Sequence, residues 1–207
     1  MRGGAERTRI AVFARAPIAG FAKTRLIPEI GADRAADLQS RLIVQSVATA
    51  IAARLGPVSL WCAPNRRHDL FESLAAKHGI DLYDQVGPDL GARMLHAFEA
   101  LTPHFATLLI GTDCPVLRPI HLSGSLSALD RDTDAVFIPA EDGGYVLVGM
   151  QRPIPVLFSG ISWGTSQVME ETRLRASQAK LKISEPITLW DLDNTADYSR
   201  AVSLGLI

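Results

Sequence analysis

The chain has few cysteines, no regularly spaced histidines and no long uncharged run, and these features argue against several classes of protein. Cys62 and Cys114 have neither zinc-site spacing nor an even disulfide framework, which suits a reducing cytoplasm. The five histidines form no H-x-H or H-x-x-x-H pair, so no zinc site is expected. The longest uncharged run, Pro153–Met169, has 17 residues and is interrupted by prolines, glycines and serines. It predicts no membrane span, and we expect a soluble cytoplasmic protein.

An excess of positive charge is also missing. The chain has 21 Lys and Arg against 22 Asp and Glu, and its formal net charge is −1. Binding to a nucleic-acid backbone needs a clustered positive face, so we expect no nucleic-acid partner. A length of 207 residues with 47% hydrophobic residues suits one globular domain. We predict a single domain over residues 1–207, with residues 1–8 as a flexible head.

Short apolar runs alternate with segments of helical periodicity. The runs predict strands at 10–14, 58–63, 81–85, 106–111, 134–139 and 145–150. The periodic segments predict helices from Asp33 to the Gly56-Pro57 stop, near 67–78, 90–101 and 118–129, and after the acidic stretch 190–197. This alternation predicts an α/β fold, a single three-layer domain with a mostly parallel sheet and helices on both faces.

Polar loops that contain glycine follow several of the predicted strands. They cover residues 15–25 (the cationic loop), 86–94, 111–115 and 139–145, and the stretch 190–197 adds three acids. Ligands of such sheets bind outside the carboxyl ends of the strands, so these loops predict one common site. The cationic loop is not a P-loop, because Pro17 and Ala22 stand where glycines are needed, and the chain has no G-x-G-x-x-G fingerprint.

The charged residues of these loops predict a phosphate and metal site. We interpret Lys23 and Arg25 as phosphate contacts, since they follow a strand in a loop with glycine and proline. Asp113 suits either a metal ligand or a helix N-cap, and its Gly-Thr-Asp-Cys-Pro setting favours metal. Asp191 and Asp193 alternate, so on an extended segment they share one face, where a cation would relieve their repulsion.

Two glycine-containing motifs remain ambiguous or are excluded. Asp142 with Gly143-Gly144 predicts either a plain turn or a close approach of the backbone to a ligand. The sequence GISWG around Ser162 matches the nucleophile elbow of α/β-hydrolases, whose histidine lies downstream of the serine. The last histidine here, His121, lies upstream, so Ser162 is interpreted as a loop residue.

Taken in order, the loops resemble a known superfamily over about residues 9–198. The stretches are ARAPIAGFAKTRL, QVGPDLGARM, GTDCPVL, PAEDGGYVLVGM, LFSGISWGT and WDLDNTAD. They resemble the successive motifs of the GT-A-like nucleotide-diphospho-sugar transferases. The most similar group contains bacterial single-domain glycosyltransferases, some of them linked to arsenosugar biosynthesis. Guanylyltransferases and cytidylyltransferases of the same fold are more distantly similar. Pro88 and Asn194 depart from the pattern at positions without an assigned role.

The resemblance implies roles for individual residues. The residues that would contact the nucleotide are Ala14, Arg15, Lys23, Arg25, Gly91 and Arg93. The residues that would hold Mg²⁺ or Mn²⁺ are Asp113, Asp191 and Asp193. Asp142, Gly143 and Gly144 would face the acceptor or the sugar, and Lys23 and Asp113 would serve catalysis.

Two reactions fit these implied roles. In the first, a glycosyltransferase moves a sugar from a nucleotide sugar to a small-molecule acceptor. In the second, a nucleotidylyltransferase joins an NTP to a small phosphorylated acceptor and releases pyrophosphate. We place glycosyl transfer first because it follows the most similar group. A non-catalytic nucleotide-binding module is the third possibility, although it would not need to gather three acids.

Overall fold

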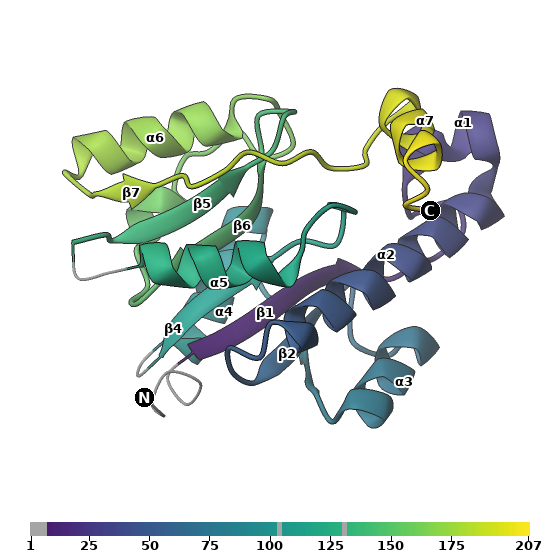
Figure 1. The fold of residues 1–207 in the computed structure, drawn as a ribbon, viewed down its shortest axis with the longest axis horizontal. Coiled ribbons are helices and arrows are strands. Elements are labelled where there is room, and N and C mark those ends of the chain that lie inside the picture. The colour runs from purple at the N-terminus through teal and green to yellow at the C-terminus, as the bar shows by residue number, and fades with distance from the viewer. Residues whose placement is uncertain (1–7, 103–104, 130–131) are drawn as a thin grey trace.

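Strands and helices alternate along the chain in the computed structural model, which describes residues 8–102, 105–129 and 132–207 (Figure 1). The strands are β1 (Thr8–Arg15), β2 (Val58–Ala63), β3 (Asp81–Asp84), β4 (Ala106–Ile110), β5 (Ala135–Pro139), β6 (Tyr145–Met150) and β7 (Ile183–Ser184). The α-helices are α1 (Ile27–Ile30), α2 (Ala32–Ala52), α3 (Asp69–His78), α4 (Leu90–Leu101), α5 (Pro119–Ala128), α6 (Val168–Gln178) and α7 (Thr195–Ser203).

The strands form one sheet in the order β3-β2-β1-β4-β6-β5-β7. All neighbouring pairs are parallel except those of β6, which runs antiparallel to β4 and to β5. A short turn at 140–144 joins β5 to β6, and such a short connection can join only antiparallel neighbours. The predicted α/β fold with a mostly parallel sheet is therefore confirmed.

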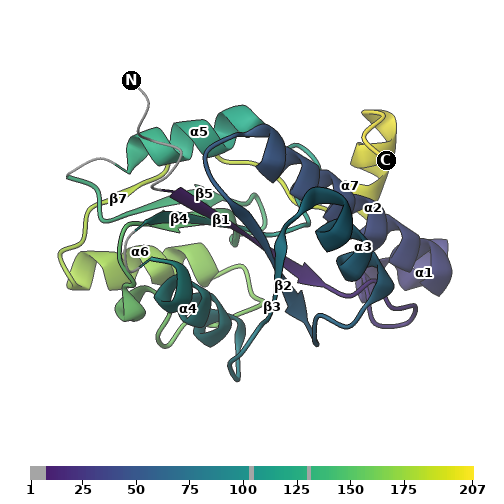
Figure 2. The same cartoon turned by 90° about the horizontal axis from the view of Figure 1, so that it is seen from below.

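Helices cover both faces of the sheet and create two hydrophobic cores (Figure 2). Strand β1 alternates between them: Ile10 and Val12 pack in the core under α2, α3 and α5, whereas Ala11 and Phe13 pack in the core under α4 and α6. Because β1 is buried on both faces, its sequence is almost continuously apolar. The carboxyl end of this interior strand is therefore held by packing on both faces of the sheet.

A third, smaller cluster attaches the C-terminal part of the chain to α2. Leu26, Leu38 and Leu42 pack there with Trp190 and Leu192, and Ala201 of α7 joins them. Leu192 is fully buried, whereas its neighbours Asp191 and Asp193 are only half-buried. The cluster thereby brings the segment Trp190–Asp193, called here the acidic segment, beside the cationic loop.

Some predicted boundaries differ from the structure. Helix α2 begins at Ala32 after Gly31, whose φ of 82° suits only glycine, and ends at Ala52 rather than near Gly56. Thr8, predicted to belong to a flexible head, is buried in β1, and residues 1–7 of that head lie outside the described residues. The short elements α1 and β7 lack the length that a sequence pattern needs for prediction.

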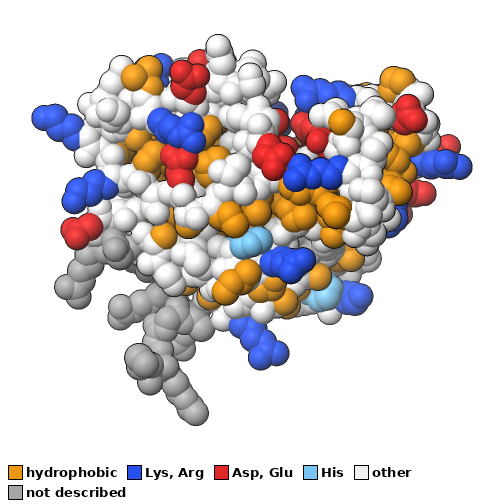
Figure 3. Space-filling model, turned by 45° about the horizontal axis from the view of Figure 1, so that its top comes forward, with side chains coloured by type: hydrophobic (Ala, Val, Ile, Leu, Met, Phe, Trp, Pro, Cys, Tyr) orange, Lys and Arg blue, Asp and Glu red, His pale blue; other side chains and the backbone are white. Residues whose placement is uncertain are grey.

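The surface carries both charge signs. On the face drawn in Figure 3, basic and acidic side chains of the described residues are interspersed, and no continuous basic patch forms there. Across the described part of the chain, no helix combines the length and apolar character that crossing a membrane requires.

Candidate active site

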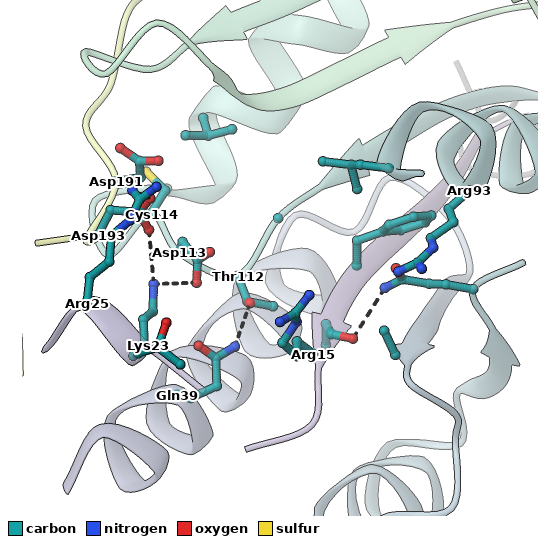
Figure 4. A pocket seen from close by; sticks show the side chains of 18 of the residues that line it. Arg15, Lys23, Arg25, Gln39, Arg93, Thr112, Asp113, Cys114, Asp191 and Asp193 are labelled. Carbon is teal, nitrogen blue, oxygen red and sulfur yellow. Dashed lines mark hydrogen bonds and ion pairs between the residues drawn. The ribbon is translucent and has the colours of Figure 1, made fainter. Parts of the chain in front are cut away.

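A cavity of about 610 Å³ opens at the carboxyl ends of β1, β2 and β4. Its walls come from the cationic loop, the 85–93 stretch at the start of α4, the loop after β4 and the acidic segment (Figure 4). These are four of the loops that the sequence predicted to share one site. The gathering follows from the topology, because parallel strands end at the same edge of the sheet.

Lys23 is a buried cation held by three oxygens. Its Nζ lies 2.7 Å from Asp113 Oδ1 and 3.6 Å from Asp193 Oδ1, and it donates a hydrogen bond of 2.6 Å to the Leu192 carbonyl. Only 5% of the side chain is exposed. A cation this buried requires such partners. In the ligand-free protein, Lys23 therefore neutralises acids, and any contact to phosphate is an additional role.

Arg25 lies on the outer side of the same acids. Its Nη1 is 3.3 Å from Asp193 Oδ2, and the side chain is 65% exposed. Directly after Lys23, Thr24–Leu26 forms a single turn of 3₁₀ helix that contains Arg25 and buries Leu26. This turn directs Lys23 inward and leaves Arg25 at the rim of the cavity (Figure 4).

Three carboxylates are close enough to share one metal ion. Asp142, Asp191 and Asp193 each offer an oxygen within 4.8 Å of the others. The predicted group contained Asp113 in place of Asp142. In the structure Asp113 pairs with Lys23, and the turn between β5 and β6 carries Asp142 to the acidic segment. A set of carboxylate oxygens is the ligand type that Mg²⁺ and Mn²⁺ prefer, so these residues fit the predicted ion.

Burial and the closeness of the other acids raise the pKa values of Asp191 and Asp193. Burial, followed by the charges of Asp142, Asp193 and Asp113, raises the pKa of Asp191 to about 7. Burial also raises the pKa of Asp193, against the opposing charge of Lys23. The cluster therefore binds a proton where a divalent cation would otherwise balance its charge.

We expect the metal-free protein to lose stability as the pH rises, because Asp191 is protonated in the folded state at pH values where it is ionised in the unfolded chain. The stabilisation by this proton is complete below the ordinary aspartate pKa of 3.8 and is lost as the pH rises through about 7. Asp191→Asn should lack this loss. Urea unfolding of the wild type and of Asp191→Asn in the presence of chelator, at about pH 5 and about pH 8, measures how the free energy of unfolding of each protein changes with pH. An equal change in the two proteins would contradict the assignment.

Asp113 is not a helix N-cap. Helix α5 begins at Pro119, and Arg118 occupies its N-cap position. Asp113 lies in the loop after β4, and its carbonyl accepts a hydrogen bond of 2.7 Å from Leu192 N. The N-cap interpretation is therefore wrong, and Asp113 binds the acidic segment through its backbone and Lys23 through its side chain.

The two glycines after Asp142 are explained by contacts within the chain. Gly143 has φ of 93°, and an added Cβ would lie 2.0 Å from the Ser166 carbonyl oxygen. Gly144 N donates 2.8 Å to Asp142 Oδ1, as in an ordinary Asx turn. Neither glycine lines the cavity, whereas the following Tyr145 does. The turn interpretation fits this geometry, and contact with a substrate stays a prediction.

Three residues predicted to contact the nucleotide also line the cavity, namely Ala14, Arg15 and Arg93. In Figure 4, Arg93 lies on the side away from Lys23, with Arg15 between them. The Arg93 Nε donates 3.0 Å to the Gly87 carbonyl, which holds the side chain along the wall. Gly91, predicted for the same role, is absent from the lining, and an added Cβ would lie 2.6 Å from the Trp163 ring. The structure thus explains Gly91 by packing against Trp163.

Sequence reasoning missed several residues of the cavity, among them Gln85, Gln39 and Phe21. Gln85 Nε2 donates to the carbonyls of Ala14 and Trp61, at 3.3 and 2.9 Å, and so ties β1 to β2 at the wall. Gln39 of α2 is buried and donates 3.2 Å to Thr112 Oγ1. Phe21, in the cationic loop, is 70% exposed at the cavity. A phenylalanine in the cationic loop, outside any predicted strand or helix, was the one sequence signal available for it.

Ser162 belongs to a structural loop. Its backbone N–H and its hydroxyl both donate to the Glu171 carboxylate, at 2.6 and 2.9 Å. The serine is thus engaged by an acid rather than by a histidine, which agrees with its interpretation as a loop residue.

The family of this protein follows from a match over more than half of its length. Residues 46–165, more than half of the chain, match the family described as "Uncharacterized protein conserved in bacteria (DUF2064)". This protein belongs to that family. No curated protein matches the chain.

Solved structures with the same fold include several transferases. A protein from Desulfovibrio desulfuricans G20, provisionally assigned as a nucleotide-diphospho-sugar transferase, is 29% identical with a TM-score of 0.83, over 93% of this chain and 85% of that chain. A CMP:2-keto-3-deoxy-manno-octonic acid synthetase in complex with CTP is 11% identical with a TM-score of 0.62, over 97% and 98%. Rv0371c from Mycobacterium tuberculosis H37Rv, in complex with manganese, is 16% identical with a TM-score of 0.59, over 96% and 99%. The predicted superfamily is confirmed, and two of these three structures are described as a nucleotide-diphospho-sugar transferase and a CTP-bound synthetase.

Proposed function

We propose that this protein is a metal-dependent glycosyltransferase that moves a sugar from a nucleotide sugar to a small-molecule acceptor. The observation that carries the proposal is the contact between Lys23 and the acids at one end of a nucleotide-sized cavity. Cations and carboxylates gathered at one end of a cavity suit a diphosphate held with a divalent cation. The resemblance of the fold to nucleotide-using transferases supports the same reading.

The residues divide the work at the diphosphate. Asp142, Asp191 and Asp193 would hold Mg²⁺ or Mn²⁺, which would supply Lewis-acid stabilisation of the leaving diphosphate. Lys23 and Arg25 approach the same place from the cationic loop and would donate hydrogen bonds to phosphate oxygens. Asp113 keeps Lys23 oriented in the cavity wall. The chain then positions the donor and neutralises its developing charge.

The charge balance of the cavity favours a nucleotide sugar over a triphosphate. Four cations and four carboxylates line it: Arg15, Lys23, Arg25, Arg93, Asp89, Asp113, Asp191 and Asp193. One divalent cation balances the diphosphate of a nucleotide sugar, whereas a nucleoside triphosphate carries more negative charge than one ion offsets. A lining without excess positive charge therefore suits the diphosphate.

Nucleotidyl transfer is the second candidate. It is supported by the fold shared with a CTP-bound synthetase and by the cationic loop, whose Lys23-Thr24-Arg25 resembles that of nucleotidyltransferases. In this reaction the acceptor would attack the α-phosphorus of an NTP, and pyrophosphate would leave.

A cytoplasmic location stays a prediction from the two free cysteines, Cys62 and Cys114.

Product analysis separates the two reactions. We expect the purified protein with Mn²⁺ to hydrolyse one nucleotide sugar slowly to a nucleoside diphosphate, because water can replace the acceptor hydroxyl. The same sample should release no pyrophosphate from any NTP. Pyrophosphate release in the presence of a small phosphorylated acceptor, together with inert nucleotide sugars, would assign the nucleotidyl reaction instead. Nucleotide binding without turnover or metal dependence would support a non-catalytic module.

A further inference from the structure

Two of the three clustered acids come from segments far apart in the sequence, and one arginine contacts the neighbour of each. Glu141 precedes Asp142, Trp190 precedes Asp191, and Arg200 of α7 contacts both Glu141 and Trp190. We propose that Arg200 is a positioning residue that sets the separation of the Asp142 and Asp191 carboxylates and thereby the affinity for the divalent cation. The inference rests on the metal site of the proposed function.

The contacts use the particular shape of an arginine side chain. Nη1 and Nη2 of Arg200 donate to the two carboxylate oxygens of Glu141, at 2.8 and 3.4 Å. The guanidinium carbon also lies 4.4 Å from the centre of the Trp190 ring. A planar guanidinium can form a forked ion pair at its edge and stack on an aromatic ring with its face, whereas a lysine ammonium cannot do both.

The contacts of Arg200 with Glu141 and Trp190, called here the clamp, lie just beyond the last backbone hydrogen bonds between the two segments. Leu189 N donates 3.0 Å to the Pro139 carbonyl, Glu141 N donates 2.9 Å to the Leu189 carbonyl, and Ala140 forms a parallel bridge with Leu189. Beyond Glu141 and Leu189 no further backbone bond between the two segments is seen in the described residues. In Figure 1 the yellow chain leaves β7, passes the end of β5 and continues to α7. The clamp thus extends the pairing to the residues beside the acids.

The third acid is tied to the same helix. Asp197 of α7 accepts hydrogen bonds of 3.1 Å from Asp193 N and Asn194 N, and Asn194 Oδ1 in turn caps the first turn of α7. Helix α7 is therefore fixed to Asp193 at its start and, through Arg200, to the turn that carries Asp142. Carboxylates held close together repel one another, so a tether across the two segments keeps them at chelating distance.

An exposed ion pair elsewhere on the molecule supplies a matched control. Arg173 donates to both oxygens of Glu185, at 2.9 and 2.6 Å, and is exposed to a similar degree as Arg200. It lies on α6, and its partner contacts no member of the acid cluster in the described part of the chain. Exposed pairs of this kind contribute little to stability, so both Arg→Met variants should fold.

The test measures Mn²⁺ binding to the metal-free protein, by electron paramagnetic resonance of the free ion, so that it does not depend on turnover. Arg200→Met should weaken Mn²⁺ binding about tenfold, as expected for a group that orients metal ligands from behind. Glu141→Gln should show a similar loss, and combining the two should add little further. Arg200→Lys should recover only part of the affinity, and Arg173→Met should match the wild type.

The possible results distinguish the positioning role of Arg200 from the existence of the metal site. Arg200→Met and Glu141→Gln proteins that bind Mn²⁺ as tightly as the wild type would overturn the positioning role while leaving the metal site in place. An equal loss in Arg173→Met would also overturn it, because the effect would then reflect a general loss of surface ion pairs. Failure of the wild-type protein to bind Mn²⁺ would overturn the metal site, and the positioning role with it.

Discussion

Replacing Lys23 with methionine should lower turnover by about 10²–10³-fold, the cost of removing one donor that stabilises transition-state charge. The same variant should bind Mn²⁺ more tightly than the wild type. In the ligand-free protein, Lys23 Nζ lies 2.7 Å from Asp113 and 3.6 Å from Asp193. Without this cation the carboxylates lose their internal partner, and a divalent cation meets less competition.

Turnover of a nucleotide sugar at saturating Mn²⁺ and direct titration with Mn²⁺ test both halves of this expectation. Arg25→Met is the matched control, because Arg25 is exposed and makes one longer contact, of 3.3 Å, with Asp193. It should cost turnover less than about tenfold. A Lys23→Met protein that keeps its turnover, or that loses Mn²⁺ binding together with its turnover, would contradict the assigned role.

Asp142→Asn should nearly abolish stabilisation of the protein by Mn²⁺. Asp142 is one of three carboxylates with oxygens within 4.8 Å of one another, and an amide oxygen is a much weaker partner for the ion. The fold should survive, since the asparagine Oδ1 can still accept the 2.8 Å hydrogen bond from Gly144 N. Thermal unfolding at about pH 8, with and without Mn²⁺, measures the effect; at that pH Asp191 is largely ionised.

Asp113→Asn is the informative comparison for Asp142→Asn. Asp113 binds Lys23 instead of joining the acid trio, so this variant should keep Mn²⁺ stabilisation and lose turnover through a misplaced Lys23. The opposite pattern, with Mn²⁺ stabilisation lost in Asp113→Asn and kept in Asp142→Asn, would restore the metal role that the sequence suggested for Asp113.

Much of the fold could be predicted because it depends on local patterns. The strands at 58–63 and 145–150 are mostly apolar runs between breakers, and the structure places both at those bounds. The edge of the sheet that carries the site also followed, since parallel strands end together. Helix α2 shows the limit of this reasoning, because Gly31 rather than Asp33 precedes its first turn.

The composition of the acid cluster could not be predicted, because it depends on contacts between distant segments. Asp142 reaches Asp191 through the bridge between Ala140 and Leu189 and the clamp at Arg200, and none of these contacts leaves a local pattern. For the same reason the sequence showed the charge of Lys23 without its partners. The roles of the glycines were ambiguous for the same reason. A Cβ at position 91 would clash with the Trp163 ring, and a Cβ at position 143 would clash with the Ser166 backbone.

The proposed function requires that the cavity binds a diphosphate-containing nucleotide only together with a divalent cation held by the acids. Its most direct test is thermal unfolding of the wild-type protein at about pH 8 with a series of nucleosides, nucleotide sugars and NTPs, each with Mn²⁺ and with chelator. At a hundredfold excess over Kd a ligand stabilises by about 2.7 kcal/mol, which raises Tm by roughly 5–10 °C in a chain of this size. We predict such a rise for at least one nucleotide sugar, only in the presence of Mn²⁺. An equal rise with chelator, or a rise with the free nucleoside as large as with its nucleotide sugar, would contradict the claim.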